Sequence, residues 1–544
     1  MKPECLPFSQ IPHTTRLFAD FLFDYTKVQQ FYPRSPRFTE WIKNEARPKS
    51  ETVPYDSDRR QRVSDILERQ NRSWDASAKT LENIARLRAG ASVVVTGQQV
   101  GLFGGPLFSL FKAVTAVKLA DLATQAGSDC VPVFWLATED HDLAEVNHVF
   151  MPGPDAALKD LAAPTEGFTD APVAAVKFSP EFQPVVDDAI RLLGDSEVSE
   201  FIRQAYRPGE TFGSAFARLF ARLFADWGVI LLDASDPELH RVAAPIYRGA
   251  IERAAKLDDA LLARGKELEA ASYHQQVKVT PSSTLLFTLR NGARVPVHRR
   301  TNGNPTNDEF LIAEERISRS ELLGRIESSP QEFSPNVLLR PVVQDYLLPT
   351  LAYTGGSAEV AYFAQVAVVY QELLGRVTPV IPRFSATIVE AKPKALLDRY
   401  GLSLPGLFHG PEQLRERMAV HALPRELQSA FEQADASLEK SLTAIRESLA
   451  RLDNTLVDAA NNAGSKMHHQ LESLRARAAR AELRQSEILS RHAELLSNSL
   501  YPNKALQERG IAGVYFLARY GSRFLMDLYE NVHTDCLDHQ VISL

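Results

Sequence analysis

The sequence predicts an α/β fold with a parallel-sheet core and a long α-helical arm late in the chain. Three observations predict it. Short, apolar, β-branched runs alternate with stretches of helical periodicity, as in βαβ units. A glycine-rich turn joins the first of these runs to the helix that follows it. A proline-free stretch near residues 425–499 carries leucines at steps of four and three, which is typical of a coiled coil.

The composition limits the class of protein. The chain has 544 residues, enough for two to four domains, and its 44% hydrophobic and 24% charged residues are typical of a soluble globular protein. A net charge of -7 argues against a general nucleic-acid binder.

The N-terminus lacks the apolar region of a signal peptide, and no apolar run is long enough to span a membrane. The three cysteines (Cys5, Cys130, Cys536) form no C-x-x-C pair, so we expect a reducing, cytoplasmic location.

The first 150 residues are expected to hold the first half of the core. Helical spacing of apolar residues over 59–88 predicts helices. Strands are predicted at Ser92–Thr96 and Val131–Thr138, with a helix at Leu107–Gln125 between them, and Pro106 would suit the first turn of that helix. Together these elements form a βαβ unit.

The remainder alternates between insertions and core. Residues 151–228 are expected to form a first insertion, 229–271 to return to the core with a strand at Val229–Asp233, and 272–333 to form a second insertion. That insertion contains a hairpin turning at Asn291-Gly292. Residues 334–424 are expected to complete the core, with a turn at Gly355-Gly356 and a strand at Val377–Ile381; residues 500–544 close it.

The arm is interpreted as an antiparallel helical hairpin. Two leucine-rich series, from Leu438 to Leu456 and from Met467 to Leu495, are out of phase by one residue. We place the turn between them at residues 461–465, with Gly464 ending one helix and Ser465 capping the next. The alternative is one long helix with a stutter. Each half would be about 50 Å long at about 1.5 Å per residue, and an arm of that length predicts a partner, most simply a second copy.

The glycine-rich turn, Thr96–Pro106, is the first candidate ligand site. Its glycines let backbone amides approach an anion where a helix begins, and Gln98 and Gln99 can hydrogen-bond a ligand. The turn matches neither the dinucleotide nor the Walker pattern. It can equally be a tight turn that needs glycine for packing.

Acidic residues follow the second strand. The run Glu139-Asp140-His141-Asp142, with Asn147 behind it, would be costly after a buried strand unless the side chains are solvated, paired or used. We interpret it as a ligand clamp in which acids hold an amine or a metal and His141 acts as an acid or base. A solvated loop that caps a helix is the alternative. The spacing does not fit zinc, whereas oxygen ligands suit Mg²⁺.

Two further segments carry polar groups inside apolar surroundings. The first holds Arg340, Gln344, Tyr353, the Gly355-Gly356 turn and Glu359, and suggests a second edge of a ligand site, although a buried arginine is often structural. The second holds Tyr501-Pro502-Asn503 and Gln507-Glu508-Arg509 at the base of the arm, where a hinge is the alternative.

Taken together, four segments closely resemble the cysteine-adding enzymes of bacillithiol biosynthesis: TGQQVGLFGGPLFSLFKA, PVFWLATEDHDLAEVNHV, FSPNVLLRPVVQDYLLPTLAYTGGSAEVAYFAQ and LYPNKALQERG. They spread from residue 95 to about residue 525. The resemblance implies a Rossmann-like core with two connecting-peptide insertions and a coiled-coil arm that forms a homodimer. It implies an enzyme that joins L-cysteine to glucosaminyl malate through an amide bond, the last step in making bacillithiol.

More remotely, the core resembles class I aminoacyl-tRNA synthetases and nucleotidyltransferases. Gly101–Leu107 falls where that group has an HxGH motif, but both histidines are missing here. No KMSKS loop is present, and Pro382-Arg383-Phe384-Ser385 stands in its approximate place. Those motifs stabilise charge on the transferring phosphates.

We therefore predict a ligase that uses ATP, by adenylation of a carboxylate, with Mg²⁺ as a candidate ion. The predicted catalytic residues are Asp140, His141 and Asp142. The predicted substrate contacts are Gln98, Gln99, Gly101, Gly104, Gly105, Glu139, Asn147, Arg340, Gln344, Tyr353, Gly355, Gly356 and Glu359. The predicted ATP contacts are Thr96, Gly97, Arg383, Ser385, Asn503 and Arg509. Two alternatives stay open: a nucleotidyltransferase-like enzyme acting on another acid and amine, and a non-catalytic nucleotide-binding scaffold.

Overall fold

A parallel sheet lies at the centre of the body, as the sequence predicted, and it has five strands, one more than the sequence indicated. In the computed structural model, which describes residues 3–43, 55–155, 157–165, 170–300, 308–485, 487–532 and 536–544, the strand order is β13-β12-β2-β3-β6. These strands span Val380–Pro382, Thr350–Gly355, Ser92–Gln98, Cys130–Leu136 and Ile230–Asp233. All neighbouring pairs run parallel, so the carboxyl ends of the strands meet along one edge.

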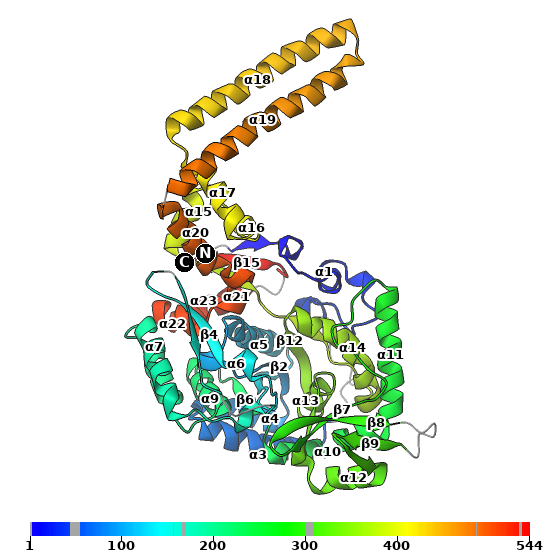
Figure 1. Cartoon of the computed structure of the whole chain (residues 1–544). Coiled ribbons are helices and arrows are strands. Elements are labelled where there is room, and N and C mark those ends of the chain that lie inside the picture. The colour runs from blue at the N-terminus through cyan, green and yellow to red at the C-terminus, as the bar shows by residue number, and fades with distance from the viewer. Residues whose placement is uncertain are drawn as a thin grey trace.

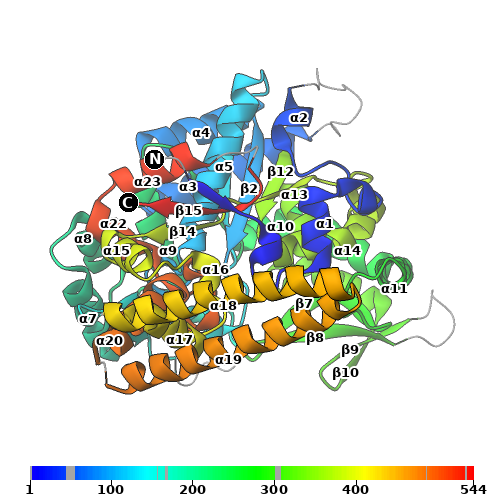
Figure 2. The ribbon, with the colours of Figure 1, turned by 90° about the horizontal axis from the view of Figure 1, so that it is seen from above.

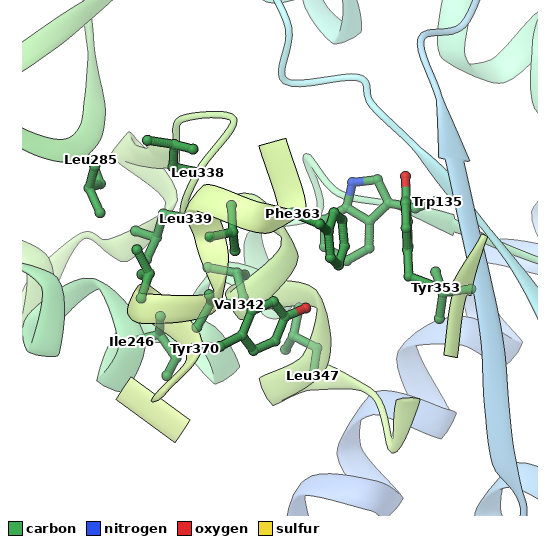
Figure 3. Packing of buried hydrophobic residues seen from close by; sticks show 14 of the residues in the cluster. Trp135, Ile246, Leu285, Leu338, Leu339, Val342, Leu347, Tyr353, Phe363 and Tyr370 are labelled. Carbon is green, nitrogen blue, oxygen red and sulfur yellow. The ribbon is translucent and has the colours of Figure 1, made fainter. Parts of the chain in front are cut away.

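Both faces of this sheet are covered by helices, which explains the unbroken apolar runs. Val93 and Val95 of β2 pack toward one core, whereas Val94 packs against Ala116 and Leu119 of α5 (Phe108–Gln125) on the other face. The first core also receives α3 (Ser57–Ser73), α4 (Ala78–Ala89), α10 (Pro237–Glu252), α13 (Arg340–Leu347) and α14 (Ser357–Leu374). Figure 3 shows Trp135 of β3 and Tyr353 of β12 beside Phe363 of α14, whose ring centroid lies 5.0 Å from that of Tyr353.

Several predicted boundaries were wrong, and one is the strand predicted at Val131–Thr138, which ends at Leu136. Pro106 precedes α5 instead of occupying its first turn, and it makes an isolated bridge with Ala512. The strand predicted at Val377–Ile381 begins later, at Val380, because it pairs with β12 only over Val380–Pro382.

The two inserted regions form small structures of their own. Residues after β3 form α6 (Leu143–Val146), the hairpin of β4 (His148–Pro152) and β5 (Leu158–Ala162), and the helices α7 (Gln183–Leu193), α8 (Glu197–Ala205) and α9 (Phe212–Leu223). The later insertion is an antiparallel sheet of order β10-β9-β8-β7-β11, with strands Glu315–Ser318, Glu309–Ile312, Ala293–Arg300, Ser283–Arg290 and Phe333–Pro335. The predicted turn is confirmed: Asn291 and Gly292 have φ of 52° and 80°, as a two-residue hairpin of this kind requires.

The two ends of the chain meet in a third sheet. β1 (Glu4–Leu6) pairs antiparallel with β15 (His539–Ser543), which pairs parallel with β14 (Ala386–Val389). Figures 1 and 2 both show the N- and C-termini side by side at this sheet. Around it lie the N-terminal α1 (Arg16–Phe23) and the helices α15 (Ala391–Arg399), α16 (Leu404–Leu407), α17 (Pro411–Ala422), α21 (Gln507–Gly510), α22 (Gly513–Tyr520) and α23 (Arg523–Asn531). The remaining helices of the body are α2 (Phe38–Ile42), α11 (Ala254–Ala270) and α12 (Arg319–Ser328).

The arm is the predicted helical hairpin, but its turn was misplaced. α18 (Arg425–Leu452) and α19 (Leu456–Gln485) project from the body in Figure 1, and α20 (Glu487–Leu500) leads back to it. The chain turns at residues 453–455, where the Asp453 side chain accepts hydrogen bonds from the backbone and hydroxyl of Thr455. Gly464 and Ser465 therefore lie inside α19 and cap nothing. Gly464 is instead a contact point, because a Cβ there would lie 2.9 Å from Leu442 of α18.

Within the residues described, no helix is both long and apolar enough to cross a lipid bilayer.

Candidate active site

A cavity of about 630 Å³ opens at the carboxyl edge of the central sheet. It brings together residues from the end of β2 onward and the acidic stretch after β3, which are two of the candidate ligand segments of the sequence. The predicted residues that line it are Gly97, Gln98, Gln99, Glu139, Asp140, Arg340, Tyr353, Gly356, Glu359, Arg383 and Arg509. This is the edge at which open parallel sheets bind their ligands.

Lys112 and Glu359 form a buried ion pair in one wall of the cavity. Lys112 Nζ lies 2.6 Å from Glu359 Oε2 and also donates to the carbonyl of Gly97 (2.7 Å) and to Gln98 Oε1 (2.9 Å). Glu359 caps α14 by accepting from the Gly356 amide (2.7 Å), and it accepts from the Tyr353 hydroxyl. Burial alone would raise the pKa of Glu359, but the Lys112 ammonium and these hydrogen bonds hold it below its usual value. The pair therefore fixes the ends of β2, β12 and α14 relative to one another.

Arg340 lies beside Tyr353 and Tyr362, and its hydrogen bonds within the described part of the chain do not use all of its N–H donors. Its guanidinium donates to Gln344 Oε1 (3.0 Å) and to the Tyr362 hydroxyl (3.1 Å). Its Cζ lies 5.4 Å from the centroid of the Tyr353 ring. A guanidinium carries five N–H groups, so three remain for other acceptors.

Glu139 is a buried carboxyl in the cavity wall. Its Oε1 lies 3.4 Å from His240 Nε2, yet it has no hydrogen-bond partner among the described residues. Burial raises the pKa of Glu139 to about 8, against the pull of the Arg294 charge, and burial lowers the pKa of His240 to about 4. Near neutral pH both groups are therefore uncharged, and Glu139 holds a proton that it can exchange.

Asp140 sits at the rim, in a network of polar groups. Its carboxylate accepts from Gln99 Nε2 (2.8 Å) and from the backbone amide of His141 (2.8 Å). The same Gln99 amide donates to Glu145 (2.8 Å). Arg294 Nη1 lies 4.0 Å from Asp140 and 3.4 Å from His141 Nδ1. Gln99 and Arg294 thus orient Asp140 toward the cavity, while His141 stands behind it and does not line the cavity.

Arg383, at the end of β13, is supported from behind by Glu508. The two side chains form a buried ion pair of 2.5 Å. Glu508 also accepts from Ser385 Oγ (2.9 Å) and from the amide of Ala386 (3.1 Å). Burial would raise the pKa of Glu508, and the Arg383 charge holds it below its usual value instead. Arg383, Gly356 and Arg509 also line an adjoining cavity of about 290 Å³.

The prediction that the glycine turn binds an anion through its amides was wrong. Gly101, Gly104 and Gly105 are buried, and their amides donate to the carbonyls of Gln99, Gly101 and Leu102. The Gly104 amide also donates to the Tyr206 hydroxyl. A Cβ on Gly101 would lie 2.9 Å from the Gly105 Cα, so packing explains the glycines. Within the Thr96–Pro106 turn, the residues that line the cavity are Gly97, Gln98 and Gln99 at its start.

Several other predicted site residues lie elsewhere. Asp142 caps α6 by accepting from the Glu145 amide (3.2 Å), and Asn147 bonds Thr165 (3.3 Å). Thr96 is buried in the sheet, where it donates to the carbonyl of Thr354 (2.8 Å), and Gln344 positions Arg340 from behind. Gly355 and Ser385 line the smaller cavity, and Asn503 lies on an exposed turn that lines neither.

Sequence reasoning missed several lining residues, above all Lys112 and Arg294. Lys112 had a usable signal, since a lysine stands inside the apolar run of the helix after the glycine turn. Arg294 had none, because it lies on β8 of the later insertion and only the tertiary fold brings it to the cavity. Trp135 and Glu145 did have a signal, because they flank the acidic stretch on either side, whereas Tyr362 lies inside the apolar run of α14.

The described residues contain no group of three or more His, Cys, Asp and Glu side chains placed to hold a metal ion. The cavity instead combines five cationic side chains (Lys112, Arg294, Arg340, Arg383, Arg509) with four carboxyl groups (Glu139, Asp140, Glu145, Glu359). Such a site can bind an anionic ligand and move a proton beside it.

The fold and this site define a Rossmann-like α/β protein with a ligand cavity at its sheet edge and a C-terminal coiled coil. Family models described as "Bacillithiol biosynthesis BshC, N-terminal Rossmann-like domain" and "Bacillithiol biosynthesis BshC, C-terminal coiled-coil domain" match residues 1–384 and 386–544. The chain belongs to the bacillithiol biosynthesis BshC family, as the resemblance of its motifs predicted.

Relatives match over their whole length. A protein of Koribacter versatilis named "Putative cysteine ligase BshC" is 49% identical over 544 residues, covering 100% of both chains. Proteins of the same name from Solibacter usitatus and Salinibacter ruber are 36% and 35% identical, covering 99% and 97% of this chain and 99% and 96% of their own.

Proposed function

We propose that this protein is a ligase that joins the carboxyl group of L-cysteine to the amine of glucosaminyl malate, forming an amide in the last step of bacillithiol biosynthesis, with ATP as the activating co-substrate. Family membership and the name of the full-length relatives support a cysteine ligase. The observation that carries the proposal is the cavity itself, where a cationic wall faces a carboxyl group with a pKa of about 8.

The cationic wall suits the charges of these substrates. Malate brings two carboxylates, cysteine brings one, and ATP brings phosphates. Arg340 has unused donors in a planar fork that matches a carboxylate or phosphate, so we assign it to an anionic group of the substrate. Arg383 and Arg509 lie nearer the arm and are assigned to the phosphates. ATP supplies the activation that a carboxylate needs before an amine can attack it.

We assign the acidic side chains of the cavity to binding and deprotonating the attacking amine. An attacking amine must lose its proton, and a general base works best when its pKa is near the working pH. With a pKa of about 8, Glu139 is ionised in only about a tenth of the molecules at pH 7, and this ionised form is the one that we assign as the base. Asp140, at the rim, is assigned to hold the ammonium form before transfer. His141 is assigned a positioning role, since it touches Arg294 from outside the cavity.

The test is a reconstituted reaction with ATP, L-cysteine and glucosaminyl malate, in which the amide product is measured by mass spectrometry. We expect Glu139→Gln to lower kcat/KM on the order of 10²-fold, the usual effect of losing a general base. Asp140→Asn should also lower kcat/KM, because it removes the charge that holds the ammonium form. Arg340→Met should raise KM for the malate-bearing substrate. Asp142→Asn is the matched control on the same loop, because asparagine also caps helices well and the side chain does not line the cavity.

Wild-type rates in Glu139→Gln and Asp140→Asn would overturn the assignment of these residues. An absence of product, together with ATP–pyrophosphate exchange driven by a different acid, would overturn the substrate and favour a nucleotidyltransferase-like enzyme instead.

A further inference from the structure

Two cysteines from opposite ends of the chain lie in contact. Cys5 and Cys536 are separated by 531 positions, yet their Sγ atoms are 2.8 Å apart. A disulfide bond is about 2.05 Å long, so the sulfurs need to approach by only about 0.8 Å to bond. Cys5 is exposed and Cys536 is partly exposed, whereas the third cysteine, Cys130, is buried in β3. The contact pair is therefore the one that small molecules can reach.

The two thiols lie beside the paired strands β1 and β15. Cys5 is the middle residue of β1, where it stands opposite Gln540 of β15, and Leu6 stands opposite His539. Cys536 lies three residues before β15 on the segment that enters this sheet. Cys536 lies four residues before Gln540, so the contact between the two Sγ atoms, and not the strand register, brings it to Cys5. Neither strand has to move far for the bond to form.

We propose that Cys5 and Cys536 form a reversible intramolecular disulfide by exchange with the disulfide of a low-molecular-weight thiol. In the first step the Cys5 thiolate attacks one sulfur of the small disulfide, which releases one small thiolate and leaves a mixed disulfide on Cys5. In the second step the Cys536 thiolate attacks Cys5 Sγ and releases the second small thiolate. The two cysteines lose two electrons and two protons, and the small disulfide takes them up as two thiols.

The surroundings set the order of these steps. Burial and the hydrogen bond with Cys5 raise the pKa of the Cys536 thiol to about 12, so Cys536 is the poorer first nucleophile. In the second step, the closeness of Cys5 Sγ, 2.8 Å away, offsets this low thiolate fraction. Cys5 is the more exposed of the two, and it is the one that meets the small disulfide first.

The bond would clamp a sheet that stands behind the candidate active site. His539, on β15, is neutral, since burial lowers its pKa to about 4. Its ring bridges Ser385 Oγ (2.7 Å, at Nδ1) and Thr387 Oγ1 (2.8 Å, at Nε2). Ser385 in turn donates to Glu508, the ion-pair partner of Arg383 in the cavity wall. The disulfide would thus lock β1 onto the strand that supports this network, and the inference does not depend on which substrates the cavity binds.

The experiment uses the reduced full-length chain, incubated with glutathione disulfide and then alkylated and digested without reductant. We expect a linked peptide that joins Cys5 to Cys536, with Cys130 alkylated as a free thiol. The melting temperature should rise on oxidation and return with dithiothreitol. Cys130→Ser should keep the crosslink and the rise in melting temperature, and Cys5→Ser and Cys536→Ser should lose both.

Three results would overturn the proposal: Cys5 and Cys536 both remaining free thiols, a glutathione adduct on Cys5 persisting as the end product, or a crosslink forming between two chains on a non-reducing gel.

Discussion

Glu139 shows how burial alone can give a carboxyl group the chemistry of a near-neutral acid. It follows β3 directly, faces the cavity and has no hydrogen bond to its Oε1 among the described residues. The neighbouring His240 offers no positive charge that would stabilise an ionised Glu139, because burial keeps the imidazole ring neutral. The consequence is a loss of stability whenever Glu139 must ionise.

This predicts a pH-dependent difference between the wild type and Glu139→Gln. Between the usual carboxyl pKa of 4.5 and the folded value of about 8, the unfolded chain has lost this proton and the folded chain keeps it. The folded state binds more protons there, so its stability falls as the pH rises, by up to about 1.4 kcal/mol per pH unit. Urea unfolding at about pH 6 and about pH 8 should show the wild type losing more stability than Glu139→Gln. Equal losses of unfolding free energy in the wild type and Glu139→Gln would contradict the raised pKa. The control is Glu145→Gln, at the exposed rim, which should lose stability as the wild type does.

The buried Lys112–Glu359 ion pair should matter more for the free energy of unfolding than an exposed ion pair does. Removing one partner of a buried pair leaves an uncompensated charge, so we expect Lys112→Met to cost about 3–5 kcal/mol in the free energy of unfolding. The double variant Lys112→Met/Glu359→Gln should cost less than the sum of the two single variants. Lys394→Met breaks the exposed pair with Asp398 and should cost less than about 1 kcal/mol. Additive costs in the double variant would show that the two charges are not coupled.

The site residues that the sequence predicted correctly include several that directly follow a recognisable strand. Gln98, Glu139 and Asp140 directly follow apolar runs, and parallel strands bring such positions together. Asp142 is only two residues beyond Asp140, yet it turns away to cap a helix. Sequence distance cannot separate these two outcomes, because the direction of each side chain is set by a turn that packing determines.

At the scale of the elements, the helical periodicity predicted for the arm was right and the predicted position of its turn was wrong. The leucine series runs at steps of four and three straight through the turn, so Leu452 ends α18 and Leu456 begins α19 without a break in the pattern. Gly464 looks like a helix stop, but it is the small residue that lets the two helices approach. Glycine has both uses, and only the position of the partner helix distinguishes them.

A bulky residue at Gly464 should therefore loosen the hairpin. Its added Cβ would lie 2.9 Å from Leu442 Cδ1 and the rest of a leucine side chain would force α18 and α19 apart. We expect Gly464→Leu to increase amide hydrogen exchange in both helices. Gly324→Leu is the matched control, because that glycine is exposed in α12 and a Cβ added there would have no atom within 4 Å. Equal protection of the arm in Gly464→Leu and the wild type would rule out the close contact.

At the scale of the whole molecule, several large apolar side chains of the arm are exposed. Ile445, Leu452 and Leu474 are 49%, 78% and 57% exposed. These side chains belong to α18 and α19, which project from the body in Figure 1 and otherwise carry many charged residues. Exposed apolar patches of this kind mark interaction surfaces, and a second copy of the chain is the partner we propose.

We expect the protein to sediment as a dimer and the variant Ile445→Glu/Leu474→Glu to sediment as a monomer at the same concentration. Two buried charges at an apolar interface cost more than the contacts can supply. Lys440→Glu places a new acidic group on an exposed arm position outside the leucine series and should remain dimeric. A monomeric wild type at micromolar concentration would refute a dimer formed through the arm.

The sequence by itself determined the parallel sheet, the Asn-Gly hairpin, the helical arm and the family, because each depends on local periodicity or on contiguous motifs. The tertiary structure alone decided that Lys112 and Arg294 also line the cavity, since they reach it from a helix and an inserted sheet. It also decided that Cys5 meets Cys536 across the whole length of the chain. Contacts between residues so far apart depend on how complete elements pack, and no local pattern records that packing.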